Sequence, residues 1–121
     1  MTVIGAINHL DAVKPNTYGQ TEKIRWLSTL DGLVKKEIID THEGDEIEFN
    51  GYDDNSLLKE LLVPSPHDDI YIKWLEAQID YAQGEYGKYN NSITMFNSAY
   101  ANYAAYYNRT HMPKQKAITN W

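Results

Sequence analysis

The amino-acid sequence predicts a mainly α-helical protein, a small bundle of about four helices with a short acidic arm between the second and third. Two observations predict this class. Apolar side chains recur every three or four residues in four separate segments, a spacing that places them on one face of a helix. The chain has 121 residues, 42% hydrophobic and 23% charged, as in an ordinary globular domain. We therefore expect one helical domain over residues 1–108, with the arm at about 43–54, and a C-terminal tail over 109–121.

The first two helices are predicted before residue 44. The first is expected over 2–13, and it ends before Pro15 because proline disfavours helix in the residue that precedes it. The second is expected to begin near Thr21, whose side chain can cap it, and to stop by Gly44. Its apolar face is wide, as in a helix buried on one side, and consists of Ile24, Trp26, Leu27, Leu30, Leu33, Val34 and Ile38.

An acidic segment follows the second helix. Between Glu37 and Glu60 the chain carries nine carboxylates and one lysine, a net charge of −8 in a protein whose total is −6. Acidic and apolar residues alternate over 46–49, which is the period of a β-strand, and Asn50-Gly51 favours a tight turn. One short strand needs a partner, so the arm is expected to be extended or to fold as a β-hairpin. The charge is explained equally by a solvated face and by a patch for a basic or DNA-repelling surface.

The third and fourth helices are expected to form an antiparallel pair. The third begins after the Pro64-Ser65-Pro66 break, where Asp68 and Asp69 can cap it, and it ends near Gly84. It is apolar on two sides, which is typical of a central helix covered by neighbours on both. The fourth helix has the clearest pattern, because its apolar stripe steps by alternating fours and threes through Tyr89, Ile93, Phe96, Tyr100, Tyr103 and Tyr107.

Candidate catalytic and metal-binding residues are few. The absence of cysteine excludes disulfides, thiol nucleophiles and metal–thiolate sites. None of the four histidines forms a close ligand pair with another. His67, Asp68 and Asp69 could together hold a divalent ion, but capping of the third helix explains the two aspartates more simply. The sequence has no phosphate-binding glycine loop, no nucleophile elbow and no apolar run long enough to cross a membrane. We therefore expect no enzymatic activity, no cofactor, no metal and no membrane contact.

The tyrosines and the tail indicate contacts with other proteins. A stripe of tyrosine in place of leucine suits a surface buried against a partner, although core packing produces the same pattern. Base stacking is disfavoured because single-strand binders use basic grooves, and this chain is acidic. The tail carries Arg109, Lys114 and Lys116, and it is expected to be weakly ordered unless a partner holds it.

Several segments together are similar to a known family. They are LLVPSPHDDIY (61–71), AQIDY (77–81), GE (84–85), YNNS (89–92), FN (96–97) and YNRTHMP (107–113), with KPN (14–16) and WLSTLDG (26–32) earlier. They resemble the head–tail connector, or adaptor, proteins of tailed bacteriophages and prophages of Gram-positive bacteria. The resemblance covers nearly the whole chain. It implies a helical subunit that assembles as a ring beneath the portal, around a channel that carries DNA, and that contacts the next connector or tail completion protein.

The expected function is therefore that of a non-enzymatic, ring-forming connector in the virion, made in the host cytoplasm and without sequence-specific nucleic-acid contacts. An alternative is a small acidic regulatory or inhibitory protein that mimics DNA and binds a nucleic-acid enzyme. The arm is expected to reach a neighbouring subunit or face the channel, and the tail to dock onto a partner. The candidate contact residues are Glu43, Asp45, Glu46, Glu48, Phe49, Tyr52, Tyr100, Tyr103, Tyr107, Arg109, Lys114, Lys116 and Trp121.

Overall fold

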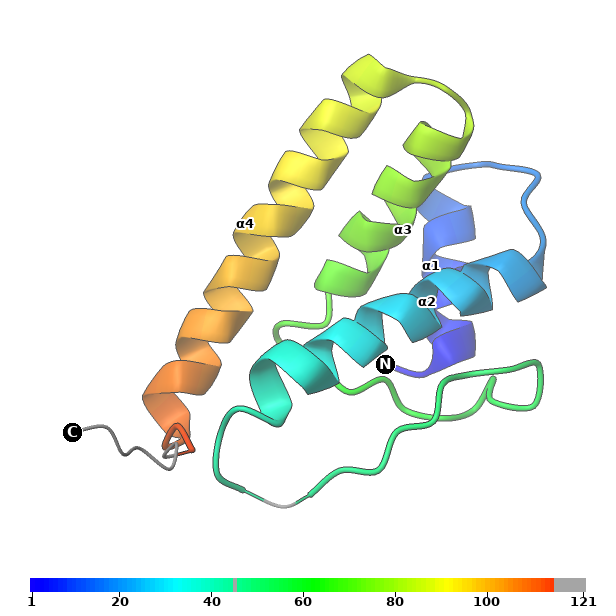
Figure 1. Ribbon diagram of the computed structural model, residues 1–121. Coiled ribbons are helices and arrows are strands. Elements are labelled where there is room, and N and C mark those ends of the chain that lie inside the picture. The colour runs from blue at the N-terminus through cyan, green and yellow to red at the C-terminus, as the bar shows by residue number, and fades with distance from the viewer. Residues whose placement is uncertain (45, 115–121) are drawn as a thin grey trace.

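The computed structural model describes residues 1–44 and 46–114. These residues form a mainly helical bundle with no β-strand and two isolated β-bridges, so the predicted fold class is confirmed (Figure 1). One π-helical turn continues the second helix without a break. The elements are α1 (Val3–Val13), α2 (Gln20–Val34), η1 (Lys35–Ile39), α3 (Ile70–Ala82) and α4 (Tyr86–Thr110).

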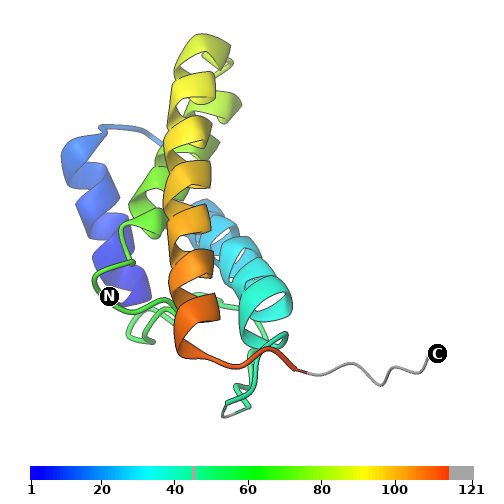
Figure 2. The ribbon, with the colours of Figure 1, turned by 90° about the vertical axis from the view of Figure 1, so that its left-hand side faces the viewer.

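The central helix is α3, as its two apolar sides predict. It contacts α1, α2 and α4, and α4 runs beside it in the opposite direction (Figures 1 and 2). Gly84 makes the reversal between α3 and α4 possible, because its φ of +73° lies in the left-handed region that favours glycine. The antiparallel pair and its turn are therefore confirmed. The core between these helices contains Val3, Leu10, Leu27, Leu30, Val34, Leu75, Ile79 and Phe96.

The ends of α1 follow the sequence prediction closely. The Thr2 side chain accepts a hydrogen bond from the Gly5 amide at 3.0 Å, which satisfies one of the free donors of the first turn. The helix stops at Val13, two residues before Pro15. Val13 itself is 54% exposed, so only the earlier members of its apolar stripe reach the core.

Two side chains predicted to cap helices form no capping hydrogen bond, although Asp69 does occupy the N-cap position of α3. The N-cap of α2 is Gly19, and the hydroxyl of Thr21 donates instead to Asp54, with 3.2 Å between Thr21 Oγ1 and Asp54 Oδ1. At the start of α3, Asp69 has helical backbone angles, whereas a capping side chain needs an extended backbone to reach back to the free amides. Its carboxylate therefore forms an ion pair with Lys73, one turn later, at 2.7 Å.

The acidic arm contains no strand and no hairpin over 46–54. The chain runs along α2 and reverses at 53–56, where the Ser56 amide donates to Asp53 O at 2.9 Å (Figure 1). Gly51, which was expected in a tight turn, has a φ of +89° and brings the backbone against α2, where the Tyr52 amide donates to Ser28 Oγ at 3.0 Å. A side chain on Gly51 would lie 3.1 Å from that oxygen, so contact with α2 sets the course of the arm.

The last helix is longer than expected. α4 continues to Thr110, so Arg109 is helical and the described part of the tail starts at His111. The boundary predicted at residue 108 therefore falls inside the helix. The His111 amide closes the last turn by donating to Tyr107 O at 2.9 Å.

Candidate interaction surface

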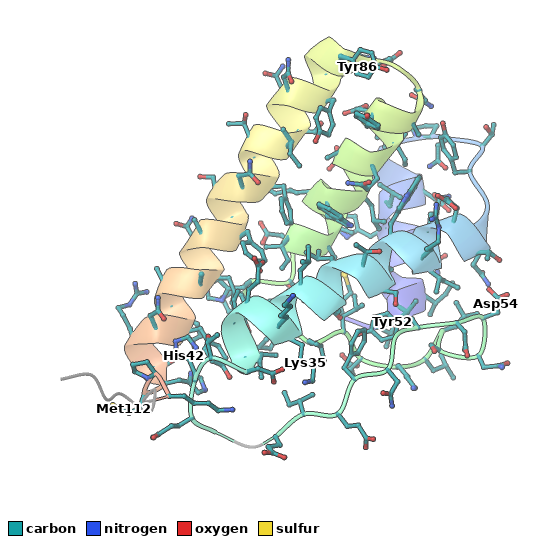
Figure 3. The ribbon with its side chains drawn as sticks, in the orientation of Figure 1. Lys35, His42, Tyr52, Asp54, Tyr86 and Met112 are labelled. Atoms are coloured by element: carbon teal, nitrogen blue, oxygen red, sulfur yellow. The ribbon has the colours of Figure 1, made fainter. Side chains whose placement is uncertain are left out.

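The base of the acidic arm and the C-terminal segment meet at one end of the molecule. The Glu43 amide donates to Met112 O at 2.7 Å, and the Lys114 amide donates to Thr41 O at 2.9 Å, forming an antiparallel bridge around His42. Figure 3 shows His42 and Met112 at this end, far from Tyr86. Two segments about seventy residues apart in sequence therefore leave the helical body at the same place.

The buried side chain of His42 holds this junction together. Its Nδ1 lies 2.6 Å from Ile38 O, and its Nε2 lies 2.5 Å from Asn108 Oδ1 on α4. The ring packs edge-on against Tyr107, with 5.0 Å between ring centres, and Tyr107 in turn stacks flat on His111 at 3.7 Å. Hydrogen bonds and ring contacts thus join the end of η1, the end of α4 and the start of the tail.

The arm leaves this junction as an exposed acidic segment. Side chains of Glu46 and Glu48 are exposed, whereas those of Ile47 and Phe49 are partly buried against the body. Phe49 packs edge-on against Tyr52, with 5.0 Å between ring centres. The alternation seen in the sequence therefore describes an arm with an apolar inner side and an acidic outer side.

The far end of the arm is anchored by Asp31, which is fully buried on α2. Asp31 Oδ2 accepts hydrogen bonds from the Tyr52 hydroxyl and, at 3.0 Å, from the Leu62 amide. Asp31 Oδ1 accepts from the Tyr71 hydroxyl on α3 at 2.6 Å, and that hydroxyl accepts from the Val63 amide at 2.8 Å. One carboxylate therefore connects α2, α3, the arm and the loop that precedes α3.

Burial dominates the ionisation of this cluster. It raises the pKa of the Asp31 carboxyl above its usual value, while the hydrogen bonds from Tyr52, Tyr71 and Leu62 act in the opposite direction. Burial and the neighbouring carboxylate both raise the pKa of the two tyrosine hydroxyls, which are therefore protonated donors at neutral pH. These groups hold the arm in place, and each donor has an acceptor.

The tyrosine stripe of α4 packs largely within its own chain. Tyr103 is only 2% exposed, so its ring packs inside its own chain and presents almost no surface to a neighbouring subunit. The Tyr100 hydroxyl donates to Glu37 Oε1 at 2.9 Å, and Tyr107 belongs to the His42 junction. Both rings are half-buried, because α3 and the end of α2 cover this face of the helix.

The charged candidates lie where a partner can reach them. All eight described carboxylates between residues 37 and 60 are exposed, including Glu43, Glu46 and Glu48. Arg109 is exposed in the last turn of α4, and Lys114 is exposed beyond it. The remaining candidates, Asp45, Lys116 and Trp121, lie outside the described residues.

Sequence reasoning missed the residues that organise this surface. Asp31 lies on the apolar face of α2, four residues after Leu27 and three before Val34. A charged residue on a buried helix face indicates a buried polar cluster, and this signal could have identified it from the sequence. His42 and Asn108 gave no comparable signal, because their hydrogen bond joins residues that are 66 positions apart.

The described residues were also searched for grooves, metal-binding clusters and membrane-spanning helices. An open groove of about 430 Å³ between the start of α3 and α4 is lined by Pro66, His67, Lys73 and Met95, among others. Residues 1–44 and 46–114 contain no group of three His, Asp or Glu side chains placed to bind a metal, and none of their helices has the length and apolarity needed to span a membrane.

Comparison with protein-family models, curated proteins and solved structures finds no match to this chain.

Proposed function

We propose that the protein is a non-enzymatic head–tail connector of a tailed bacteriophage or prophage, a subunit of a ring that bridges portal and tail around the DNA channel. One observation carries this proposal: an exposed acidic arm and a C-terminal segment leave the helical body at the same junction, around His42. Exposed surface segments that meet at one end of a packed core are suited to contacts with neighbouring proteins. The segments that resemble connectors include this junction, at YNRTHMP (107–113).

The charge of the surface is compatible with a channel that carries DNA. The segment from Glu37 to Glu60 has a net charge of −8, and its eight described carboxylates face solvent. Negative charge beside a DNA duplex repels the phosphate backbone, so DNA can pass without binding. In this proposal the partners are further copies of the chain, the portal protein and the next connector or tail completion protein. The subunit is made in the host cytoplasm and resides in the virion.

Attachment to portal rings tests the proposal directly. The chain would be co-expressed with the portal protein encoded in the same phage gene cluster, and the rings examined by electron microscopy for an added layer. A chain ending at Lys114 keeps every described contact, and a Glu46→Gln/Glu48→Gln variant neutralises the arm. Both are expected to fold normally and to occupy fewer portals than the full chain. A Glu22→Gln/Glu85→Gln variant removes the same charge away from the arm and is the matched control.

The result that contradicts this role is also defined. If the full-length chain does not co-purify with portal rings under conditions in which the portal assembles, the protein is not a connector that binds the portal. Normal occupancy by both the shortened chain and the neutralised arm would show that the helical body makes the contact, and the arm and tail would lose their assigned role.

A DNA mimic is the second candidate, and the exposure of all eight described carboxylates favours it as well. A mimic presents its carboxylates to the DNA-binding groove of an enzyme, so adding duplex DNA should displace it. A connector should remain on portal rings when DNA is added. Competition by DNA therefore separates the two functions.

A further inference from the structure

We propose that residues 46–50 of the acidic arm bind the C-terminal segment of a second copy, residues 114–118, as an added β-strand. The proposal deepens the connector function by naming the contact between neighbouring subunits. It rests on that function only in requiring that copies of the chain meet.

The backbone of the arm has no pairing partner in the described part of the chain. From Glu46 to Gly51, no backbone N–H or C=O group forms a hydrogen bond with any described residue. The limb that returns after the turn is different, since Leu57 O and Lys59 O accept hydrogen bonds from the amides of Ile4 and Val3 at 2.9 and 3.0 Å. Unpaired backbone along an exposed segment is a template for strand addition, in which main-chain hydrogen bonds supply the affinity.

The surroundings of the arm leave space for another chain. A groove of about 480 Å³ runs along residues 46–50 on the side of Lys35. A second groove of about 310 Å³ separates the arm from the segment Lys59–Leu62. With Ile47 and Phe49 held against the body, an added strand can pair with the backbone of the arm without displacing the core.

Charge selects the C-terminal segment as the occupant. Glu46 and Glu48 are two residues apart and exposed on the outer side of the arm, and Lys114 and Lys116 have the same spacing. Residues two apart on a strand share a face, so both lysines can lie opposite both glutamates at once. The segment from Lys114 onward has no acidic residue, so no like-charge pair opposes this register.

The direction of the chain favours a second copy over the same molecule. Residues 112–114 already pair antiparallel with 41–43 of their own chain, so at Lys114 the chain heads towards the residues before Thr41, away from the arm. A strand formed by 114–118 of another copy leaves this internal pairing intact. In that register Gln115 lies opposite Ile47.

Disulfide cross-linking of full-length chains tests the contact, and the absence of native cysteine makes the chemistry clean. A Gln115→Cys chain, enlarged by a tag, would be mixed with an Ile47→Cys chain under mild oxidation. Neighbouring residues on paired strands have the Cα separation that a disulfide needs, so a tagged heterodimer is expected. Thr94→Cys, exposed on α4, replaces Ile47→Cys in the control and should give only background. Circular dichroism checks that each variant is folded.

Charge exchange then tests the register. Adding Glu46→Lys/Glu48→Lys to the Ile47→Cys chain should lower the initial rate of heterodimer formation by about tenfold, because like charges then face each other. Adding Lys114→Glu/Lys116→Glu to the other chain should restore the rate. Heterodimer yields equal to the Thr94→Cys background, or a rate unaffected by either reversal, would overturn the proposal.

A single chain with both cysteines separates the two possible origins of the bond. The proposal expects it to form linked oligomers, whereas a closed monomer at high dilution as the main product would place the tail on its own arm and overturn the contact between copies. This result is independent of portal attachment. Cross-linking without portal binding would refute the connector function and support the contact between copies. Portal binding without cross-linking would support the connector function and refute the contact.

Discussion

Replacing Tyr71 with phenylalanine removes one oxygen atom from the centre of the protein and should destabilise it strongly. The hydroxyl is completely buried, donates to Asp31 Oδ1 at 2.6 Å and accepts from the Val63 amide at 2.8 Å. The ring keeps its volume, so the change affects hydrogen bonding and leaves the packing of α3 nearly intact.

The size of the effect follows from the groups that lose a partner. One carboxylate oxygen of Asp31 and the amide of Val63 are left unsatisfied in a region that water does not reach. Each unsatisfied buried group costs about 1–3 kcal/mol, with charged groups at the upper end, so the free energy of unfolding should fall by about 3 kcal/mol. That is a large fraction of the roughly 5–15 kcal/mol that stabilises a typical domain.

Urea unfolding followed by circular dichroism measures this loss, with the slope of the transition serving as a check that the unfolded state is unchanged. Tyr52→Phe provides an internal comparison, since Asp31 Oδ2 still accepts from the Leu62 amide, and a loss of about 1 kcal/mol is expected. Tyr86 is 60% exposed at the opposite end of the molecule, so Tyr86→Phe should change stability by less than about 0.5 kcal/mol.

The pH dependence gives a second readout. Burial raises the pKa of Asp31, so the cost of its charge is present at neutral pH and disappears as the pH falls through that raised pKa. The difference between Tyr71→Phe and the unmodified chain should therefore shrink on acidification. A loss no larger than that of Tyr86→Phe, or a difference that grows in acid, would refute the role given to the Asp31 cluster.

Three further changes probe other parts of the structure. Burial alone would raise the pKa of Asp80, but hydrogen bonds, chiefly from Lys14, hold it below its usual value. Lys14→Met should therefore cost about 2 kcal/mol at neutral pH, and this deficit should shrink on acidification and vanish only once the pH is below the lowered pKa of Asp80. Gly51→Ala adds strain at a positive φ and a contact of 3.1 Å with Ser28, so unfolding experiments should show a loss of about 2 kcal/mol. Asn108→Ala removes a partner of the buried histidine at the arm junction and should speed hydrogen exchange in the C-terminal segment about tenfold, a loss of about 1.4 kcal/mol of local stability.

Each of these changes has a matched control. Lys73→Met breaks an ion pair with an exposed carboxylate and should have little effect at any pH. Gly87→Ala lies in α4 with no atom within 4 Å of the added carbon and should stabilise the protein slightly. Asn97→Ala, on the exposed side of α4, should leave exchange in the tail unchanged. Equal effects of a variant and its control would contradict the corresponding contact.

The helices could be predicted because their signals are local. Pro15 and Gly84 end α1 and α3 through backbone constraints that need no tertiary information, and the 4–3 spacing of α4 fixes its buried face. The side chains of Thr21 and Asp69 do not cap their helices because both have competing partners, Asp54 and Lys73, and Asp54 is distant in sequence.

The arm and its junction were harder to predict. The alternation at 46–49 correctly separates inner from outer residues, but strand formation requires a partner, and none is present among the described residues. The exposed carboxylates follow from composition and charge. The role of His42 could not be predicted from composition. Its hydrogen bond to Asn108 forms only because α4 is long enough, and crosses the other helices at the right angle, to bring Asn108 beside it.

The π-helical turn Lys35–Ile39 sets the direction in which the residues after α2, including His42, point from the helix axis. Its defining bond, from the Asp40 amide to Lys35 O at 2.8 Å, accommodates one more residue than an α-helical turn. Deleting one residue here would restore a regular helix and rotate the following residues by about 100°, turning His42 away from Asn108. A five-residue irregularity thus determines where the arm and the tail can meet.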